Sequence, residues 1–94
     1  MYEKNDKRRI YWLIDEYLQG KINEPTFCDE FYYSYDLGVD KNTLIDLEHE
    51  AFSELSRVTS RFSEFDEDHQ LDPRAFSTTQ ELKKKIIETK EKLK

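Results

Sequence analysis

The stretch LIDLEHEAFSELSRVTSRF, residues 44–62, decides the fold class of this 94-residue chain. Its apolar side chains recur at steps of three and four residues, the spacing that places side chains on one face of an α-helix. The stripe consists of Leu44, Leu47, Ala51, Leu55, Val58 and Phe62. We therefore predict a helix that starts near Asp40 or Asn42 and buries this stripe.

The opposite side of the same helix carries three acidic residues, Asp46, Glu50 and Glu54, each four residues from the next. Like charges at this spacing repel one another by about 0.2–0.5 kcal/mol per pair. Arg57 and Arg61 offset part of this repulsion. We expect this acidic side to face solvent.

A first helix is predicted upstream, from Asn5 or Asp6 to Gln19, with Gly20 as its stop signal. One face of this helix is apolar and is expected to be buried. Its members are Ile10, Leu13, Ile14, Tyr17 and Leu18. Trp12 points away from that face, which makes it a candidate exposed aromatic.

A second helix is predicted from Asn23, which can cap it, to the neighbourhood of Gly38. Pro25 suits its first turn, and Ile22 can pack against Phe27 as a hydrophobic staple. The expected buried stripe is Phe27, Cys28, Phe31 and Tyr35. A fourth helix is expected after Ser77 or Thr78, burying Leu82, Ile86, Ile87 and Leu93.

These four helices predict an all-α fold, a single antiparallel four-helix bundle spanning residues 1–94. Between the third and fourth helices lie about fifteen residues without a helical period, including the acidic run FSEFDEDHQLDP at 62–73. Its carboxylates are Glu64, Asp66, Glu67, Asp68 and Asp72. Connections of this length are usually functional or disordered. Because Phe65, Leu71 and Phe76 can anchor this one, we expect an ordered acidic loop that rests on the bundle.

Charge is unevenly distributed along the chain. Residues 11–72 hold sixteen acidic and four basic side chains, whereas the two ends are basic and the net charge is −6. An acidic surface repels phosphates and attracts basic proteins, which disfavours binding to nucleic acid or to an anionic membrane. Neither a signal peptide nor a membrane span can be drawn, and the single cysteine fits a reducing compartment, so we expect a cytoplasmic protein.

The residue pattern favours neither catalysis nor metal binding. The acidic run departs from a calcium-binding EF-hand, because Leu71 and Ser77 stand where glycine and glutamate are required. Cys28, His49 and His69 lack the paired spacing of a zinc site. Phosphate-binding glycine loops are missing as well. We therefore predict that the chain is not an enzyme and needs no cofactor or metal.

Protein recognition is the remaining class of function. Trp12 and Tyr33, which lies opposite Phe27 and Phe31 on the second helix, are aromatic side chains surrounded by charge, as in many protein interfaces. Two simpler interpretations stay open. In the first, Trp12 only covers the base of the long connection. In the second, Tyr33 is an ordinary surface tyrosine.

The order of these features resembles the colicin D immunity protein family, which includes immunity proteins of contact-dependent growth inhibition systems. The resembling stretches are LIDEYLQGKINEPTFCDEFYYSYD at 13–36, AFSELSRVTSRFSEFDEDHQ at 51–70 and TTQELKKKIIETKEKL at 78–93. The resemblance implies a cytoplasmic protein that covers the basic active-site cleft of a cognate toxin nuclease, typically a tRNase, with carboxylates.

The partner-binding residues predicted from the sequence and the resemblance are Glu64, Asp66, Glu67, Asp68, Asp72, Trp12, Tyr33 and Glu54. The partner is expected to be the toxin nuclease domain, with no direct contact to nucleic acid or membrane and with a monomer in the complex. Two alternatives are an antitoxin or small regulator of another system, and a helical adaptor without a nuclease partner.

Overall fold

The computed structural model describes residues 2–62 and 76–93. These residues form an all-helical fold without a strand, in which an isolated β-bridge pairs Phe62 with Ser77. The α-helices are α1 (Arg8–Leu18), α2 (Glu24–Phe31), α3 (Asp46–Thr59) and α5 (Thr79–Lys92). A π-helix, η1 (Tyr32–Asp36), continues α2, and a 3-10 turn, η2 (Lys41–Thr43), precedes α3.

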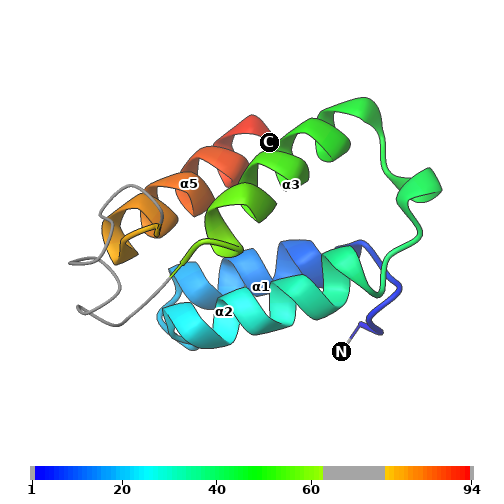
Figure 1. The fold of residues 1–94 in the computed structure, drawn as a ribbon. Helices are drawn as coiled ribbons and strands as arrows, with labels where there is room; N and C mark the ends of the chain where they lie inside the picture. The colour runs from blue at the N-terminus through cyan, green and yellow to red at the C-terminus, as the bar shows by residue number, and fades with distance from the viewer. Residues whose placement is uncertain (1, 63–75, 94) are drawn as a thin grey trace.

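The four α-helices pack in two pairs, as a helical bundle does. Helix α1 lies beside α2, and α3 lies beside α5 (Figure 1). Contacts of α1 with α5 and of α2 with α3 join the two pairs. The acidic residues predicted to form the loop before α5, from Glu64 to Asp72, lie outside the described residues.

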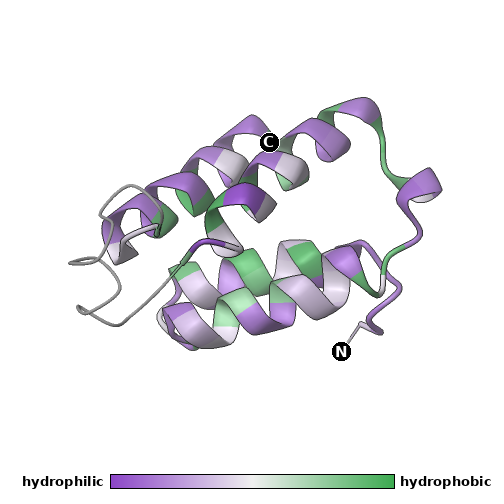
Figure 2. Ribbon diagram, viewed as in Figure 1, coloured by the Kyte–Doolittle hydropathy of each residue, from purple (hydrophilic) through white to green (hydrophobic). Residues whose placement is uncertain are grey.

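The core lies where the apolar faces of the helices meet (Figure 2). Most of the predicted stripes are confirmed, because the following members are buried: Ile10, Leu13, Ile14, Tyr17, Phe27, Phe31, Tyr35, Leu44, Ala51, Leu55, Leu82 and Ile86. Aromatic rings contact one another within the core. The ring centroids of Phe27 and Phe31 are 5.8 Å apart, and those of Phe31 and Tyr35 are 5.4 Å apart.

Several predicted helix ends are confirmed, although α1 begins at Arg8 and not at Asn5 or Asp6. Gly20 has a φ of +79°, a left-handed conformation that terminates α1. Asn23 caps α2 by accepting a hydrogen bond from the Thr26 backbone N–H at 3.0 Å. Thr78 caps α5 in the same way, with the Glu81 N–H as donor at 3.1 Å.

The predicted start of the third helix is wrong. The Asp40 carboxylate accepts a hydrogen bond from the Asn42 N–H and so caps the 3-10 turn, not α3. Leu44 and Ile45 then adopt extended backbone conformations before α3 begins at Asp46. The buried face of α3 consists of Glu48, Ala51, Phe52 and Leu55 and so differs from the predicted stripe. Leu47 lies about 100° around the helix from Glu48 and is 39% exposed.

Two further expectations need correction. Ile87 is 42% exposed, because the buried face of α5 follows Leu82, Ile86 and Thr89, and Ile87 lies about 100° away from Ile86. Cys28 is only half-buried. In the described part of the chain, no helix has the length and apolar character needed to cross a membrane.

Candidate partner-binding surface

The acidic face of α3 is engaged with α5. The Glu54 carboxylate lies 3.1 Å from the Lys85 ammonium and 3.8 Å from that of Lys92. Lys92 also pairs with Glu50 at 2.9 Å. The hydrogen bond from Lys85, followed by the charges of Lys85 and Lys92, lowers the pKa of Glu54. Glu54, a predicted partner contact, therefore already has two cationic neighbours within the fold.

Trp12 is half-buried and packs against the hydrophobic core. The Arg9 guanidinium lies over its indole ring, with the guanidinium carbon 5.5 Å from the ring centroid. The ring face under Arg9 is therefore covered within the fold. The expectation of an exposed aromatic anchor fits Trp12 only in part.

Tyr33 is exposed as predicted, and Tyr32 beside it is exposed as well, at 43% and 49%. The two rings meet edge to face, with centroids 5.8 Å apart. Asp29 and Asp36, both exposed, flank them. Residues 29, 32, 33 and 36 follow helical spacing, so we call Asp29, Tyr32, Tyr33 and Asp36 the tyrosine stripe. Sequence reasoning identified only Tyr33, although this spacing was a usable signal for the other three.

The segment around the stripe is acidic throughout. Residues 22–40 contain five carboxylates and neither lysine nor arginine. Glu30 pairs with Arg9 at 2.7 Å, and the Asp40 carboxylate caps η2. Within residues 2–62 and 76–93, Asp29 and Asp36 have no ion pair. Asp29 and Asp36 thus differ from Glu50 and Glu54 of α3, which pair with lysines of α5, whereas Asp46 of α3 likewise forms no ion pair with a described residue.

Arg9 forms three hydrogen bonds with residues that neighbour the stripe in sequence or in space. Its guanidinium donates to the Glu30 carboxylate at 2.7 Å, to the Ser34 hydroxyl at 3.1 Å and to the Tyr2 carbonyl at 3.2 Å. Ser34 is fully buried in η1. This one side chain therefore joins α1 to α2, to the π-helix and to residues 2–7, which we call the N-terminal arm.

The N-terminal arm lies against the end of η1. A Cβ built on Gly38 would overlap the Lys4 carbonyl oxygen, so this close approach requires glycine. The Lys4 ammonium lies 5.0 Å from the centroid of the Tyr33 ring, and the Arg8 guanidinium lies 4.8 Å from that of Tyr2. Both are cation–π contacts on tyrosines.

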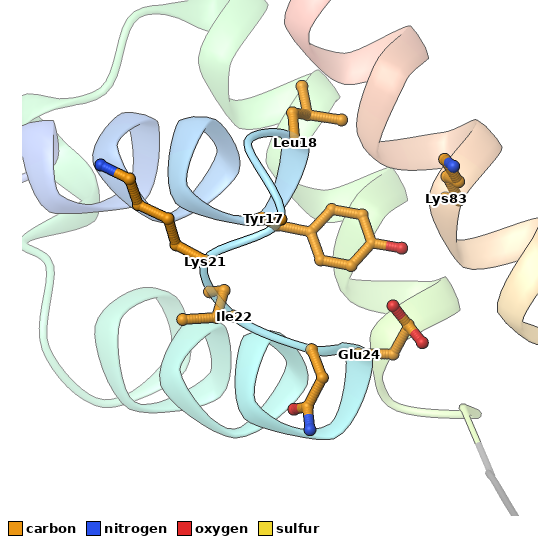
Figure 3. A pocket seen from close by; sticks show the side chains of 8 residues that line it. Tyr17, Leu18, Lys21, Ile22, Glu24 and Lys83 are labelled. Atoms are coloured by element: carbon orange, nitrogen blue, oxygen red, sulfur yellow. The ribbon is translucent and has the colours of Figure 1, made fainter.

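A pocket of about 560 Å³ opens beside the turn between α1 and α2 (Figure 3). The Tyr17 ring points from α1 toward α5, with Glu24 close to its hydroxyl and Lys83 beyond it. Burial, followed by the hydrogen bond with Glu24, raises the pKa of Tyr17 to about 12. At neutral pH this hydroxyl is therefore protonated and serves as a hydrogen-bond donor, not as a base.

Glu48 is a buried carboxylate whose partners give it a structural role. Only 4% exposed, it accepts hydrogen bonds from the Tyr11 hydroxyl, from the Lys7 ammonium at 3.1 Å and from the Ile45 N–H at 2.9 Å. These bonds tie α1 to the start of α3. Among the described residues, His, Cys, Asp and Glu side chains do not gather in groups of three or more that could hold a metal ion.

Compared with models of protein families, with curated proteins and with solved structures, the chain matches none of them. The resemblance to the colicin D immunity family therefore remains a prediction from the residue pattern. The five acidic residues predicted for the partner contact, Glu64, Asp66, Glu67, Asp68 and Asp72, lie outside the described residues.

Proposed function

We propose that this chain is an immunity protein that binds a cognate bacterial toxin nuclease, a tRNase, and neutralises it by covering its basic active-site cleft. The observation that carries the proposal is that some acidic residues of the fold form ion pairs with lysines and others do not. Glu50 and Glu54 are paired with lysines of α5, whereas Asp29 and Asp36 have no ion pair among the described residues. An acidic face whose carboxylates have no ion pair is suited to a basic protein partner.

The proposed contact includes the acidic run Glu64, Asp66, Glu67, Asp68 and Asp72, together with Trp12 and Tyr33. Carboxylates that face lysine, arginine and histidine side chains accelerate association and form charge-assisted hydrogen bonds once water is excluded. The proposal also includes an antiparallel order of the four helices, with the acidic run as the loop before α5. The complex forms in the cytoplasm with one copy of this chain.

The Glu54 carboxylate would join this contact by exchanging Lys85 and Lys92 for cations of the toxin. Surface ion pairs contribute little to stability, so such an exchange carries a small cost. Protection requires no catalysis by this chain, because blocking the nuclease cleft is sufficient.

The test is coexpression with the toxin domain, which we expect to be the basic C-terminal domain of a large secreted protein encoded by the adjacent upstream gene. Cells that express both proteins should grow, and the two should copurify as a complex that no longer cleaves tRNA. Pancreatic ribonuclease, a basic nuclease of another kind, serves as the control and should remain active. Cell death despite expression of this chain, or the lack of a complex, would refute the proposal.

A further inference from the structure

We propose that the tyrosine stripe, Asp29, Tyr32, Tyr33 and Asp36, is a docking surface for arginine side chains of a basic protein partner. It would be a second contact, separate in sequence from the acidic run at 64–72. The inference rests on the proposed function for the identity of that partner, the toxin nuclease, and it adds where and how the partner is held.

The shape and chemistry of the stripe suit a protein interface. Two adjacent tyrosine rings, each more than two-fifths exposed, offer a large apolar area, and each ring has few rotatable bonds to immobilise. Asp29 lies three residues before Tyr32, and Asp36 lies three residues after Tyr33. Aromatic groups flanked by charge are the usual centres of binding energy in protein interfaces.

The charge around the stripe selects a cationic occupant. Residues 22–40 carry no lysine or arginine, and Asp29 and Asp36 form no ion pair with any other described residue. Arginine fits these four side chains better than lysine does, because a planar guanidinium can stack on a tyrosine face and bind a carboxylate with two parallel hydrogen bonds.

Within the described residues, a cation contacts one ring of the stripe and another contacts a nearby tyrosine. The Lys4 ammonium lies over Tyr33 at 5.0 Å, and on the neighbouring arm the Arg8 guanidinium lies over Tyr2 at 4.8 Å. These are internal examples of the contact that we assign to the partner. Arg8 also pairs with Asp6 at 2.6 Å, so one guanidinium contacts a tyrosine ring and a carboxylate at the same time.

The stripe is also held in position before any partner arrives. Arg9 fixes η1 through the buried Ser34 hydroxyl, and it fixes α2 through Glu30. The close contact of Gly38 with Lys4 fixes the arm beside Tyr33. A preorganised surface loses less entropy on binding than a flexible one. Single π-helical turns in longer helices are often found at functional sites, in agreement with η1 here.

A nona-arginine peptide tests the surface without the toxin. Titration of the isotope-labelled protein should shift the NMR signals of Tyr32 and Tyr33, and nona-lysine should bind less tightly. Replacing Tyr33 by leucine, which removes the π face but stays apolar, should weaken binding about two- to fivefold. Tyr33→Phe, which keeps the ring, should bind nearly as tightly as the wild type.

A pair of charge-matched variants separates docking from simple attraction. Asp29→Asn with Asp36→Asn removes two charges from the stripe, and Asp46→Asn with Glu50→Gln removes two charges from α3. The stripe variant should lose more affinity for nona-arginine than the α3 variant. Equal losses, or unshifted signals of Tyr32 and Tyr33, would overturn the proposal. These residues are exposed, and circular dichroism of each variant verifies that the fold is retained.

The toxin domain then separates this inference from the proposed function. If the toxin binds wild-type protein but Tyr32→Leu with Tyr33→Leu binds it equally well, the docking surface is refuted and the immunity function stands. If nona-arginine docks on the stripe but the toxin does not bind, the immunity function fails and a basic partner of another kind is supported. Sedimentation tests for self-association. If the wild-type protein is a dimer and Tyr32→Leu with Tyr33→Leu is a monomer, the stripe binds a second copy of this chain and the proposal is overturned.

Discussion

The Arg9 guanidinium donates a hydrogen bond from Nε to the buried hydroxyl of Ser34, 25 residues away, at 3.1 Å. Other guanidinium nitrogens of the same side chain bind Glu30 and the Tyr2 carbonyl. Only arginine can bind three separate acceptors in this way, because its guanidinium presents several donors in a fixed planar fork. The position of the π-helix relative to α1 therefore depends strongly on one residue.

Replacing Arg9 by lysine tests this dependence. Lysine keeps the charge but cannot reach three acceptors at once, so the Ser34 hydroxyl is left without its donor. We expect a loss of about 1–3 kcal/mol in the free energy of unfolding, measured by urea denaturation. Arg8→Lys is the matched control, because Arg8 is exposed and its contacts, with Asp6 and with the Tyr2 ring, are both close in sequence. A similar stability for both variants would contradict this role of Arg9.

Glu48 should contribute to the acid sensitivity of the fold. Burial alone would raise its pKa, but hydrogen bonds from Tyr11, the Ile45 N–H and Lys7 outweigh burial and hold the pKa below the ordinary value of 4.5. A carboxyl whose pKa is lower in the folded state stabilises the fold above its unfolded-state pKa. That contribution is lost as the pH falls below 4.5, through the lower folded-state pKa.

The measurement is the urea midpoint of wild type and of Glu48→Gln between about pH 7 and pH 3, the range in which carboxyl groups become protonated. We expect the wild type to lose more stability on acidification than the variant. Asp6 and Glu54 also have lowered pKa values, but both are held by more accessible ion pairs, so high salt should weaken their contribution first. An unchanged acid response in Glu48→Gln would show that the buried cluster does not control it.

Features that depend on neighbouring residues could be predicted from the sequence, whereas features that depend on distant contacts could not. The buried faces of α1 and α2 were predictable, because their apolar spacing and the signals at Gly20 and Asn23 agree with each other. The start of α3 was not, because Asp40 provides a capping signal that the chain uses for η2. The burial of Glu48 could not be predicted either, because its partner Tyr11 lies 37 residues away in sequence.

The same distinction applies to the candidate site. Tyr33 could be placed on the outer side of its helix from phase alone, and the acidic composition of residues 22–40 is visible in the sequence. The engagement of Glu54 by Lys85 could not be foreseen, because it depends on which helices pack together. The π-helix is likewise invisible to a pattern of about 3.6 residues per turn.

The corrected phase of α3 leads to a paired prediction. Leu55 is fully buried and Leu47 is not, although both belong to the stripe that the sequence predicts. Leu55→Ala should lower the free energy of unfolding by about 2–5 kcal/mol, because it leaves a cavity in the core. Leu47→Ala should change it by about 0.5 kcal/mol or less. Equal losses in urea denaturation would mean that Leu47 is buried as deeply as Leu55 and that the phase of α3 is the one expected from the sequence.

Gly38 should be required for docking of the N-terminal arm. In Gly38→Ala the new methyl group would overlap the Lys4 carbonyl oxygen and lie 2.8 Å from that of Tyr33, so the backbone has to move. We expect faster amide hydrogen exchange in residues 2–7 and loss of the contact between Lys4 and Tyr33. Gly20→Ala is the control: its φ of +79° makes alanine strained, but the surrounding space is open. Its arm should exchange as slowly as in the wild type.

The acidic run should affect toxin binding differently from the acids of α3. If Asp66 and Asp68 face the nuclease cleft, replacing both by asparagine leaves toxin cations unpaired and should cost on the order of 2–5 kcal/mol of affinity, mainly through faster dissociation.

Asp46→Asn with Glu50→Gln removes the same charge from α3, where Glu50 already pairs with Lys92. This variant should slow association and leave dissociation nearly unchanged, because the carboxylates that it lacks act over a distance.

Raising the salt concentration should reduce the wild-type association rate far more than it raises the dissociation rate, since exposed charges are screened over about 8 Å at physiological ionic strength. Surface plasmon resonance with the toxin domain measures both rates. Small and equal effects of the two double variants, or an association rate independent of salt, would contradict charge mimicry and indicate that the acidic run only hydrates the surface.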